Sequence, residues 1–174
     1  PKTLEAYVTI VAVSCARNLD VVAADLGKPI GEDDVEPLTW ALSQMARHRS
    51  AVEYVAAVQT VHAFGRAVAS WWQTGFDLLL TPTAGEPPPP LGQFASTKAE
   101  PFTGFLRAAP FGAYTLNFNL TGQPAISLPV HWTADGLPVG AHLVAPYARE
   151  DLLLEVASEL EEALPWRDRR AAIG

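Results

Sequence analysis

Residues 117–129 have the sequence NFNLTGQPAISLP, and this stretch decides the fold that we predict. Gly122 lets the chain leave a helix, because glycine takes a left-handed backbone conformation without strain. The apolar residues 125–132 then predict a strand. Pro129 inside it indicates an edge or a bulge, since proline has no N–H group for a strand ladder. A strand that follows a helix is typical of an α/β layer.

The residues on the C-terminal side predict a hairpin and a closing helix. The turn sequence at 134–136 separates two strand-like stretches, so we expect residues 125–132 and 139–144 to pair. His131 and His142 would then face each other. Because no carboxylate lies at ligand spacing beside them, we interpret them as ordinary strand histidines and not as a metal pair. A last helix is predicted over residues 150–164, with acidic residues in its first turn.

The residues on the N-terminal side predict a buried strand at 76–81 and helices before it. The proline-rich loop 82–101 comes after this strand. Its four consecutive prolines favour a stiff, extended wall, and binding to an SH3-type domain is the weaker alternative. Ser50 and Glu53 have the spacing of a capping box at a helix start. The helices are expected over residues 4–26, 37–47 and 50–72, the first of them apolar nearly all round.

The composition describes a protein with a core. The chain has 174 residues, of which 49% are hydrophobic and 18% charged, and this excludes intrinsic disorder. A net charge of −7 argues against nucleic acid and against an anionic membrane surface as partners. No signal peptide or membrane span is expected, so we predict a cytoplasmic location. The single cysteine, Cys15, excludes an internal disulfide. We interpret it as a small packing residue, with a pocket-facing thiol as the alternative.

Catalytic motifs are absent from the sequence. It contains no GxSxG, HExxH, P-loop or GxGxxG pattern. The three lysines, Lys2, Lys28 and Lys98, lie outside the apolar strands and helices in which burial could lower the pKa of a catalytic base. We therefore assign no catalytic residue, no metal site and no cofactor.

Four segments in the same order resemble the amidase-signature family. Residues 76–83 (FDLLLTPT) are similar to its D-x-L-L-x-P-T segment, and residues 117–129 contain its N-x-x-G-x-P-A-x-S-x-P pattern. Residues 136–140 match G-L-P-V-G, and residues 150–154 match E-D-x-L-L. The resemblance covers residues 76–154, whereas the residues before it fit the family's helices by position only.

The resemblance implies an α/β fold with a mixed β-sheet flanked by helices, of which this chain is the C-terminal part. Residues 1–174 are then a single region, helical over 1–75 and forming the sheet layer over 76–164. The family hydrolyses carboxylic amides with a Ser-cis-Ser-Lys triad. Nothing in this chain matches the glycine- and serine-rich signature that carries the triad, so no triad residue can be transferred to it.

The implied function is that of a C-terminal segment of an amide hydrolase that acts through a serine acyl-enzyme. Its partners would be the triad-bearing N-terminal half and a small-molecule amide, and its parent would cleave C–N bonds in linear amides. The chain alone is expected to be inactive, and the missing initiator Met favours a truncation. A stand-alone, non-catalytic α/β module for binding or structure is the alternative. The substrate and the oligomeric state, including a homo-oligomer, stay open.

Three residues before Gly122 are the candidates for a substrate-pocket wall. Phe111, Thr115 and Phe118 have the i, i+4, i+7 spacing of one helical face. The two rings would supply apolar surface and the hydroxyl one polar contact, which is the usual composition of a ligand pocket. Core packing of the same face is the competing interpretation.

Overall fold

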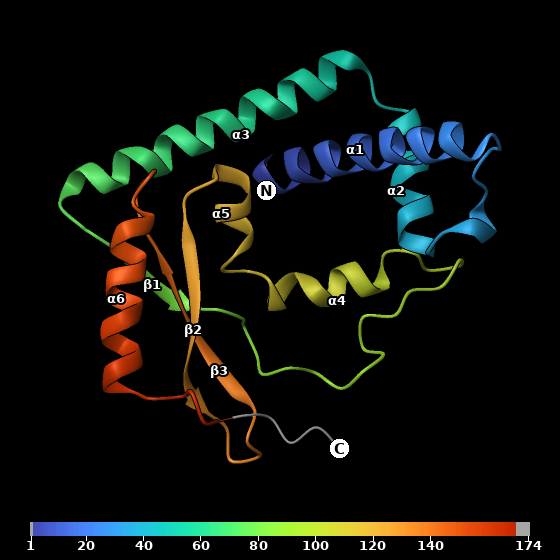
Figure 1. Cartoon of the computed structure of the whole chain (residues 1–174). Coiled ribbons are helices and arrows are strands. Elements are labelled where there is room, and N and C mark those ends of the chain that lie inside the picture. Colours follow the sequence, from blue (N-terminus) through green and yellow to red (C-terminus); the bar gives the residue numbers. More distant parts are fainter. Residues whose placement is uncertain (1, 170–174) are drawn as a thin grey trace. The chain divides into compact units, whose positions relative to one another are not determined.

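The computed structural model describes residues 2–169, and the chain divides into two compact units. The helical unit contains Pro1–Phe64 and Leu91–Ala108, and the sheet unit contains Gly65–Pro90 and Ala109–Gly174. Figure 1 shows the order of the elements along the chain. Each unit is described by itself below.

The helical unit is built around the contact of two helices. Helix α1 (Lys2–Leu26) lies against α2 (Pro37–Arg47), and Ala12, Ala16 and Ala46 are buried between them (Figure 1). Alanine side chains are short, so the two backbones can approach closely. The other elements of this unit are the 3₁₀ turn Glu32–Asp34, the larger part of α3 (Ala51–Trp71) and most of α4 (Thr103–Phe111).

Helix α1 is more apolar than its contact with α2 requires. Its buried side consists of small residues, whereas Leu4, Val22 and Leu26 are exposed. By length and composition alone α1 could cross a membrane, a criterion that the core helices of soluble proteins also meet. The expectation that this helix needs further partners agrees with these exposed side chains.

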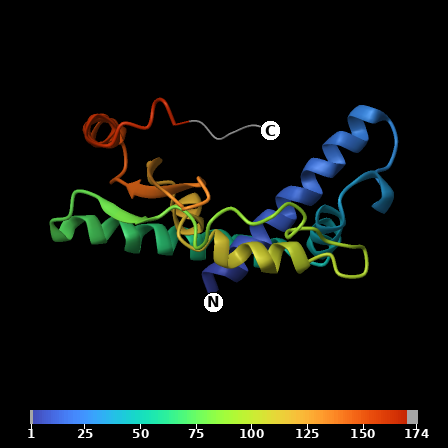
Figure 2. The same ribbon diagram turned by 90° about the horizontal axis from the view of Figure 1, so that it is seen from below.

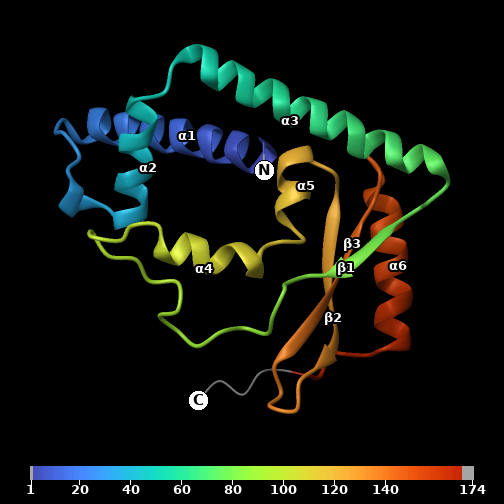
Figure 3. The ribbon, with the colours of Figure 1, turned by 180° about the vertical axis from the view of Figure 1, so that it is seen from behind.

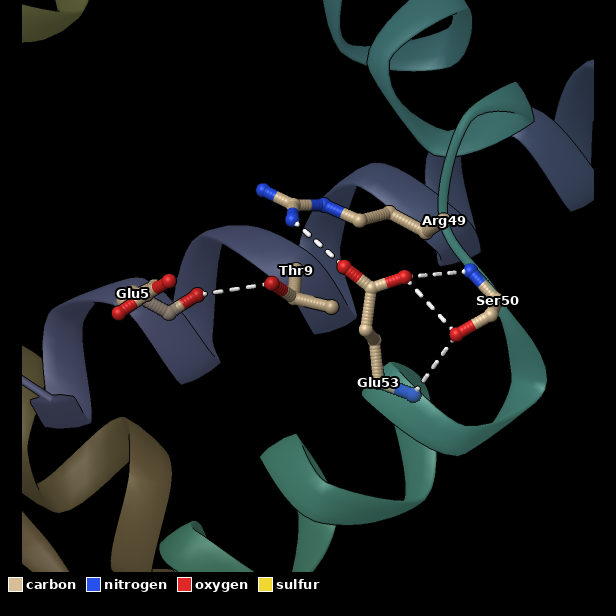
Figure 4. A network of polar contacts seen from close by, with 5 residues as sticks. All are labelled: Glu5, Thr9, Arg49, Ser50 and Glu53. Carbon is tan, nitrogen blue, oxygen red and sulfur yellow. Dashed lines mark hydrogen bonds and ion pairs between the residues drawn. The ribbon is translucent and has the colours of Figure 1, made fainter.

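The start of α3 is held by the predicted capping box, which the structure confirms (Figure 4). The Ser50 backbone N–H donates to Oε2 of Glu53 over 2.7 Å, and the Glu53 N–H donates to the Ser50 hydroxyl over 3.2 Å. The Ser50 hydroxyl also donates to Oε2 over 2.8 Å, and Arg49 adds a fourth contact to Glu53, with 3.1 Å between Nη1 and Oε1. Two backbone N–H groups that the helix leaves without a partner are satisfied in this way.

These hydrogen bonds make the stability of the helical unit dependent on pH. The Ser50 backbone N–H, the Ser50 hydroxyl and the Arg49 guanidinium lower the pKa of Glu53 from 4.5 to about 2. A carboxylate whose pKa is lower in the folded state stabilises the fold above its unfolded pKa, and this contribution is lost as the pH falls from 4.5 toward 2. Between pH 4.5 and pH 2 we expect the melting temperature of Glu53→Gln to fall less than that of wild type, as measured by thermal unfolding at each pH. Glu36→Gln is the control, because Glu36 is the N-cap of α2 without a capping side-chain bond.

Within residues 2–169 the sheet unit has three strands in the order β1-β3-β2. They are β1 (Leu79–Pro82), β2 (Ala125–Trp132) and β3 (Pro138–Val144), accompanied by the 3₁₀ turn Trp72–Thr74, α5 (Leu116–Thr121) and α6 (Glu150–Ala163). Both strand pairs in the described residues are antiparallel, so the expected mixed sheet is wrong for this part of the chain. The reason is local: β2 turns directly back into β3, and β1 joins the other side of β3.

The predicted details of the sheet are partly confirmed. Gly122 ends α5 with φ of +76°, and a register shift lies between Pro129 and His131, as the proline indicated. The first strand begins at Leu79 and not at residue 76, and it is only half-buried, with Leu80 66% exposed. The prediction of a buried strand there was wrong, because β1 is an edge strand.

The two faces of the sheet differ in chemistry because strand side chains alternate. One face is apolar and is covered by α6, which contributes buried Leu153 to a core with Leu128 and Leu143 (Figures 2 and 3). The register places Thr81, Ser127 and His142 side by side, one residue away from these leucines. The opposite face therefore contains these three polar side chains together with Leu79 and Val144, and we call it the polar face.

Candidate functional site

A cavity of about 630 Å³ opens on the polar face and lies entirely within the sheet unit. Residues from the end of β1 and the loop after it form one side, and β2 and β3 form the other. Its lining is mainly apolar and includes Phe111 and Val139. Five prolines contribute to the lining: Pro82, Pro87, Pro88, Pro129 and Pro138.

The lining contains a pair of hydroxyl groups. The Oγ1 atom of Thr83 and the Oγ atom of Ser127 lie 2.7 Å apart, so one hydroxyl donates to the other. Thr83 is held in place by its backbone, whose N–H donates to the Gly140 carbonyl over 3.0 Å. This bond continues the pairing of β1 with β3 beyond Pro82 and brings Thr83 next to the β2 residue Ser127.

Gly140 makes room for this hydroxyl pair. A Cβ atom at position 140 would lie 2.8 Å from the Ser127 hydroxyl oxygen, 3.0 Å from the Thr83 Cβ, and in still closer contact with the Thr83 hydroxyl. Real Cβ atoms do not approach other atoms below 3.0 Å. The two hydroxyls therefore depend on a residue without a side chain on the neighbouring strand.

The loop side of the cavity is attached to the end of α4. The Gly85 N–H donates to the Phe111 carbonyl over 3.0 Å, and a Cβ at Gly85 would lie 2.5 Å from the Pro110 carbonyl oxygen. The loop then continues as Pro87 and Pro88, which line the cavity. This agrees with the interpretation of the four prolines as a stiff wall.

His142 lies on the polar face next to the hydroxyl pair and is 5% exposed. Its Nδ1 is 3.0 Å from the Thr81 hydroxyl, and its ring centroid is 5.7 Å from that of Phe118. Burial lowers the pKa of His142, which favours the neutral imidazole. The predicted pairing with His131 is wrong: His142 pairs with Ser127, whereas His131 pairs with Val139.

The three candidate wall residues do not lie on one helical face, so the expected common face is wrong, whereas their role in a substrate-pocket wall stays a prediction. Helix α4 ends at Phe111 and α5 begins at Leu116, with Thr115 as its N-cap. Residues 112–115 between them form turns and not a continuous α-helix, so the i, i+4, i+7 spacing does not define one face. Phe111 lines the cavity, Phe118 packs on His142, and the Thr115 hydroxyl donates to the Gly112 carbonyl over 3.3 Å.

Sequence reasoning missed Thr83, Ser127 and Gly140 as possible site residues. One signal was available in β2, where Ser127 and Pro129 alternate with the apolar residues Ile126 and Leu128. Alternation indicates a second, more polar face, but it does not show which strand lies beside it.

The other candidates from the sequence have structural roles. Lys28 and Lys98 form exposed ion pairs with Asp34 and Asp33. The Cys15 thiol donates to the Thr39 carbonyl over 3.4 Å, and burial raises the pKa of this thiol. This contact between α1 and α2 supports the packing interpretation. Among residues 2–169 no group of histidine, cysteine and acidic side chains could hold a metal ion.

Comparison with known proteins gives the family. The amidase family model matches residues 2–154. The 6-aminohexanoate-cyclic-dimer hydrolase of Pseudomonas sp. (strain NK87) is 40% identical over 172 residues, which are 96% of this chain and 35% of that enzyme. The putative amidase AmiC of Mycobacterium bovis is 50% identical over 91 residues, 52% of this chain and 19% of that protein.

Solved structures agree in fold. The structure of a 6-aminohexanoate cyclic dimer hydrolase matches with a TM-score of 0.92 at 38% identity. The match covers 99% of this chain and 37% of the hydrolase chain. A bacterial aryl acylamidase of the amidase signature family has a TM-score of 0.73 at 18% identity, over 94% of this chain and 34% of its own. The chain therefore belongs to the amidase signature family and spans about 35% of the length of the first curated relatives that it matches.

Proposed function

We propose that this chain is the C-terminal segment of a carboxylic-amide hydrolase that acts through a serine acyl-enzyme. In this role it supplies scaffold and one wall of the substrate pocket, and it contributes no residue of the triad. The observation that carries the proposal is the cavity on the polar face, which lies within the region of the family match. The triad-bearing part of the fold is the partner that the proposal requires.

The lining suits the aliphatic part of an amide substrate and not its reacting carboxamide group. Phe111, Val139 and five prolines offer apolar surface that can hold methylene groups away from water. A relative that is 40% identical is named for a cyclic dimer of 6-aminohexanoate, a molecule rich in methylene groups. We propose a small amide with an aliphatic chain as the substrate. Binding that chain holds the amide carbon near the serine, which raises its effective concentration.

The three candidate wall residues then have different tasks. Phe111 contacts the substrate chain from within the cavity wall. Phe118 acts from behind the wall, because its ring packs against His142, which the Thr81 hydroxyl also contacts. The Thr115 hydroxyl is used by the Gly112 carbonyl and supports the turn between α4 and α5.

The test compares Phe111→Ala with Phe76→Ala in an amidase that contains this segment. Phe76 is the matched control, because it is 55% exposed and stacks on Trp71 outside the cavity. We expect Phe111→Ala to raise KM for hexanamide about 10-fold, the effect of losing part of one buried ring, with a small change in kcat. Phe76→Ala should leave both constants within about 2-fold of wild type.

A fluorophosphonate probe tests the reaction class, because it reacts with activated serines. The 174-residue chain alone should take up no probe and hydrolyse no amide, whereas the chain joined to the triad-bearing part should do both. If the joined protein is inert toward the probe and toward amides, the proposed function is wrong. The stand-alone binding module would then be the better interpretation.

A further inference from the structure

We infer that the Thr83–Ser127 hydroxyl pair is a subsite for a second, neutral hydrogen-bonding group of the substrate, a carboxamide separated from the reacting amide by an aliphatic spacer. The inference rests on the proposed function, because it specifies what the same cavity binds. It is carried by the hydrogen-bonding capacity of the lining and by the space around Gly140.

Two backbone N–H groups of the lining are already used within the chain, and its prolines have none to offer. The five prolines have no N–H group. The N–H of Thr83 is used by the Gly140 carbonyl, and the N–H of Gly85 is used by the Phe111 carbonyl. The side chains of Phe111 and Val139 offer no strong donor or acceptor. The two hydroxyls of Thr83 and Ser127 are side-chain groups of the lining that keep hydrogen-bonding capacity for a ligand.

The capacity of the pair matches a carboxamide. Two hydroxyls together have two donors and four acceptor lone pairs, and the bond between Thr83 and Ser127 uses one of each. One O–H donor and three lone pairs remain. A carboxamide has a carbonyl that can accept from the donor and N–H groups that can donate to the lone pairs. A substrate methyl group in the same place would leave the remaining O–H donor and lone pairs of the two hydroxyls desolvated and unpaired, which is unfavourable.

A carboxylate would use the pair less completely than a carboxamide. A carboxylate only accepts hydrogen bonds, so the lone pairs of the two hydroxyl oxygens would stay without a donor. A carboxamide both accepts and donates, and it can use the remaining O–H donor and the lone pairs together.

Gly140 keeps the pair open toward the cavity. Thr83, Ser127 and Gly140 all line the cavity, and any side chain at position 140 would lie within 2.8 Å of the Ser127 hydroxyl. Ser127 is also exposed in the chain, so its hydroxyl can be reached by a ligand from solvent. The place of the pair in the cavity wall and the exposure of Ser127 are two observations separate from its hydrogen-bonding capacity. Each of them favours contact with a ligand.

Binding of two matched probes to the ¹⁵N-labelled 174-residue chain tests the inference. Adipamide and hexanamide have the same carbon chain, and adipamide has a second carboxamide in place of the terminal methyl group. We expect adipamide to bind about 5- to 10-fold more tightly, the effect of one to two neutral hydrogen bonds. The shifts should be largest at the backbone amides of Gly85, Ser127 and Gly140.

Variants of the pair show whether the hydroxyls cause this preference. Ser127→Ala and Thr83→Val should each reduce it to about 2-fold or less, whereas Thr83→Ser, which keeps the hydroxyl, should retain it. Thr74→Val is the matched control, because it removes a threonine hydroxyl of the same unit that does not line the cavity and donates to the Trp71 carbonyl. Unchanged ¹⁵N spectra away from each substitution show that the variants are folded.

Three results would overturn the inference: equal affinity for the two probes, no shift at Gly140, or a preference that persists in both Ser127→Ala and Thr83→Val. Hydrolysis separates this failure from that of the proposed function. An amidase that cleaves hexanamide but shows no preference for adipamide contradicts only the subsite. A chain that prefers adipamide, in a joined protein that cleaves no amide, contradicts only the hydrolase assignment.

Discussion

Replacing Gly104 by alanine is expected to destabilise the helical unit by about 2–4 kcal/mol. Gly104 is buried in α4, and a Cβ there would overlap the backbone carbonyl oxygen of Phe94 and lie 2.7 Å from its carbonyl carbon. The Ser96 hydroxyl is also close, at 2.9 Å from this Cβ position, and it accepts the Gly104 N–H over 3.1 Å. A backbone carbonyl cannot rotate away as a side chain can, so the loop 91–97 must move as a whole.

Chemical unfolding in urea measures this effect, and Gly65→Ala is its matched control. Gly65 is also a helical glycine, in α3, but a Cβ there has nothing within 4 Å. Alanine in a helix costs less conformational entropy than glycine, so Gly65→Ala should stabilise the protein by about 0.5–1 kcal/mol. Equal free energies of unfolding for the two variants would show that the close approach at Gly104 is not a constraint.

Gly140→Ala is expected to destabilise the sheet unit by about 1–3 kcal/mol, the usual effect of overpacking, and to remove the preference for adipamide. The added methyl group would overlap the hydroxyls of Thr83 and Ser127, so their mutual hydrogen bond must break. Urea unfolding measures the first effect and the NMR titration the second.

A double-mutant cycle shows whether the two hydroxyls cause the loss of stability in Gly140→Ala. In a Thr83→Ala, Ser127→Ala background both hydroxyl oxygens are absent, and the remaining close atom is the Thr83 Cβ at 3.0 Å. Gly140→Ala should then cost at least about 1 kcal/mol less than in wild type, since residues in contact are not additive. Additive free energies would mean that the strain arises elsewhere around β3.

Features that depend on neighbours in sequence were predictable. The capping box of Ser50 and Glu53 spans four residues, and its hydrogen bonds are present as expected. Gly122 ends α5, and the turn at 134–136 connects β2 with β3. Helix ends and tight turns are determined by a few consecutive side chains and backbone angles, so a local pattern is sufficient to predict them.

Features that depend on distant partners were not predictable in the same way. The antiparallel pairing of β1 with β3 brings Thr81 to His142, 61 residues further along the chain. The hairpin register pairs His142 with Ser127 and His131 with Val139, which separates the two histidines that the turn sequence was expected to pair. The break between α4 and α5 is local, because Pro110 and Gly112 interrupt the helix, and it separates Phe111 from Phe118.

The sequence by itself determined the family, through four ordered segments between residues 76 and 154, and the local elements that these segments form. Only the tertiary structure decided the site. Thr83 and Ser127 are 44 residues apart and meet because both flank β3, where Gly140 leaves the space that they occupy. Strand register and the volume left by a missing side chain are properties of packed backbones, and no single stretch of sequence contains both partners.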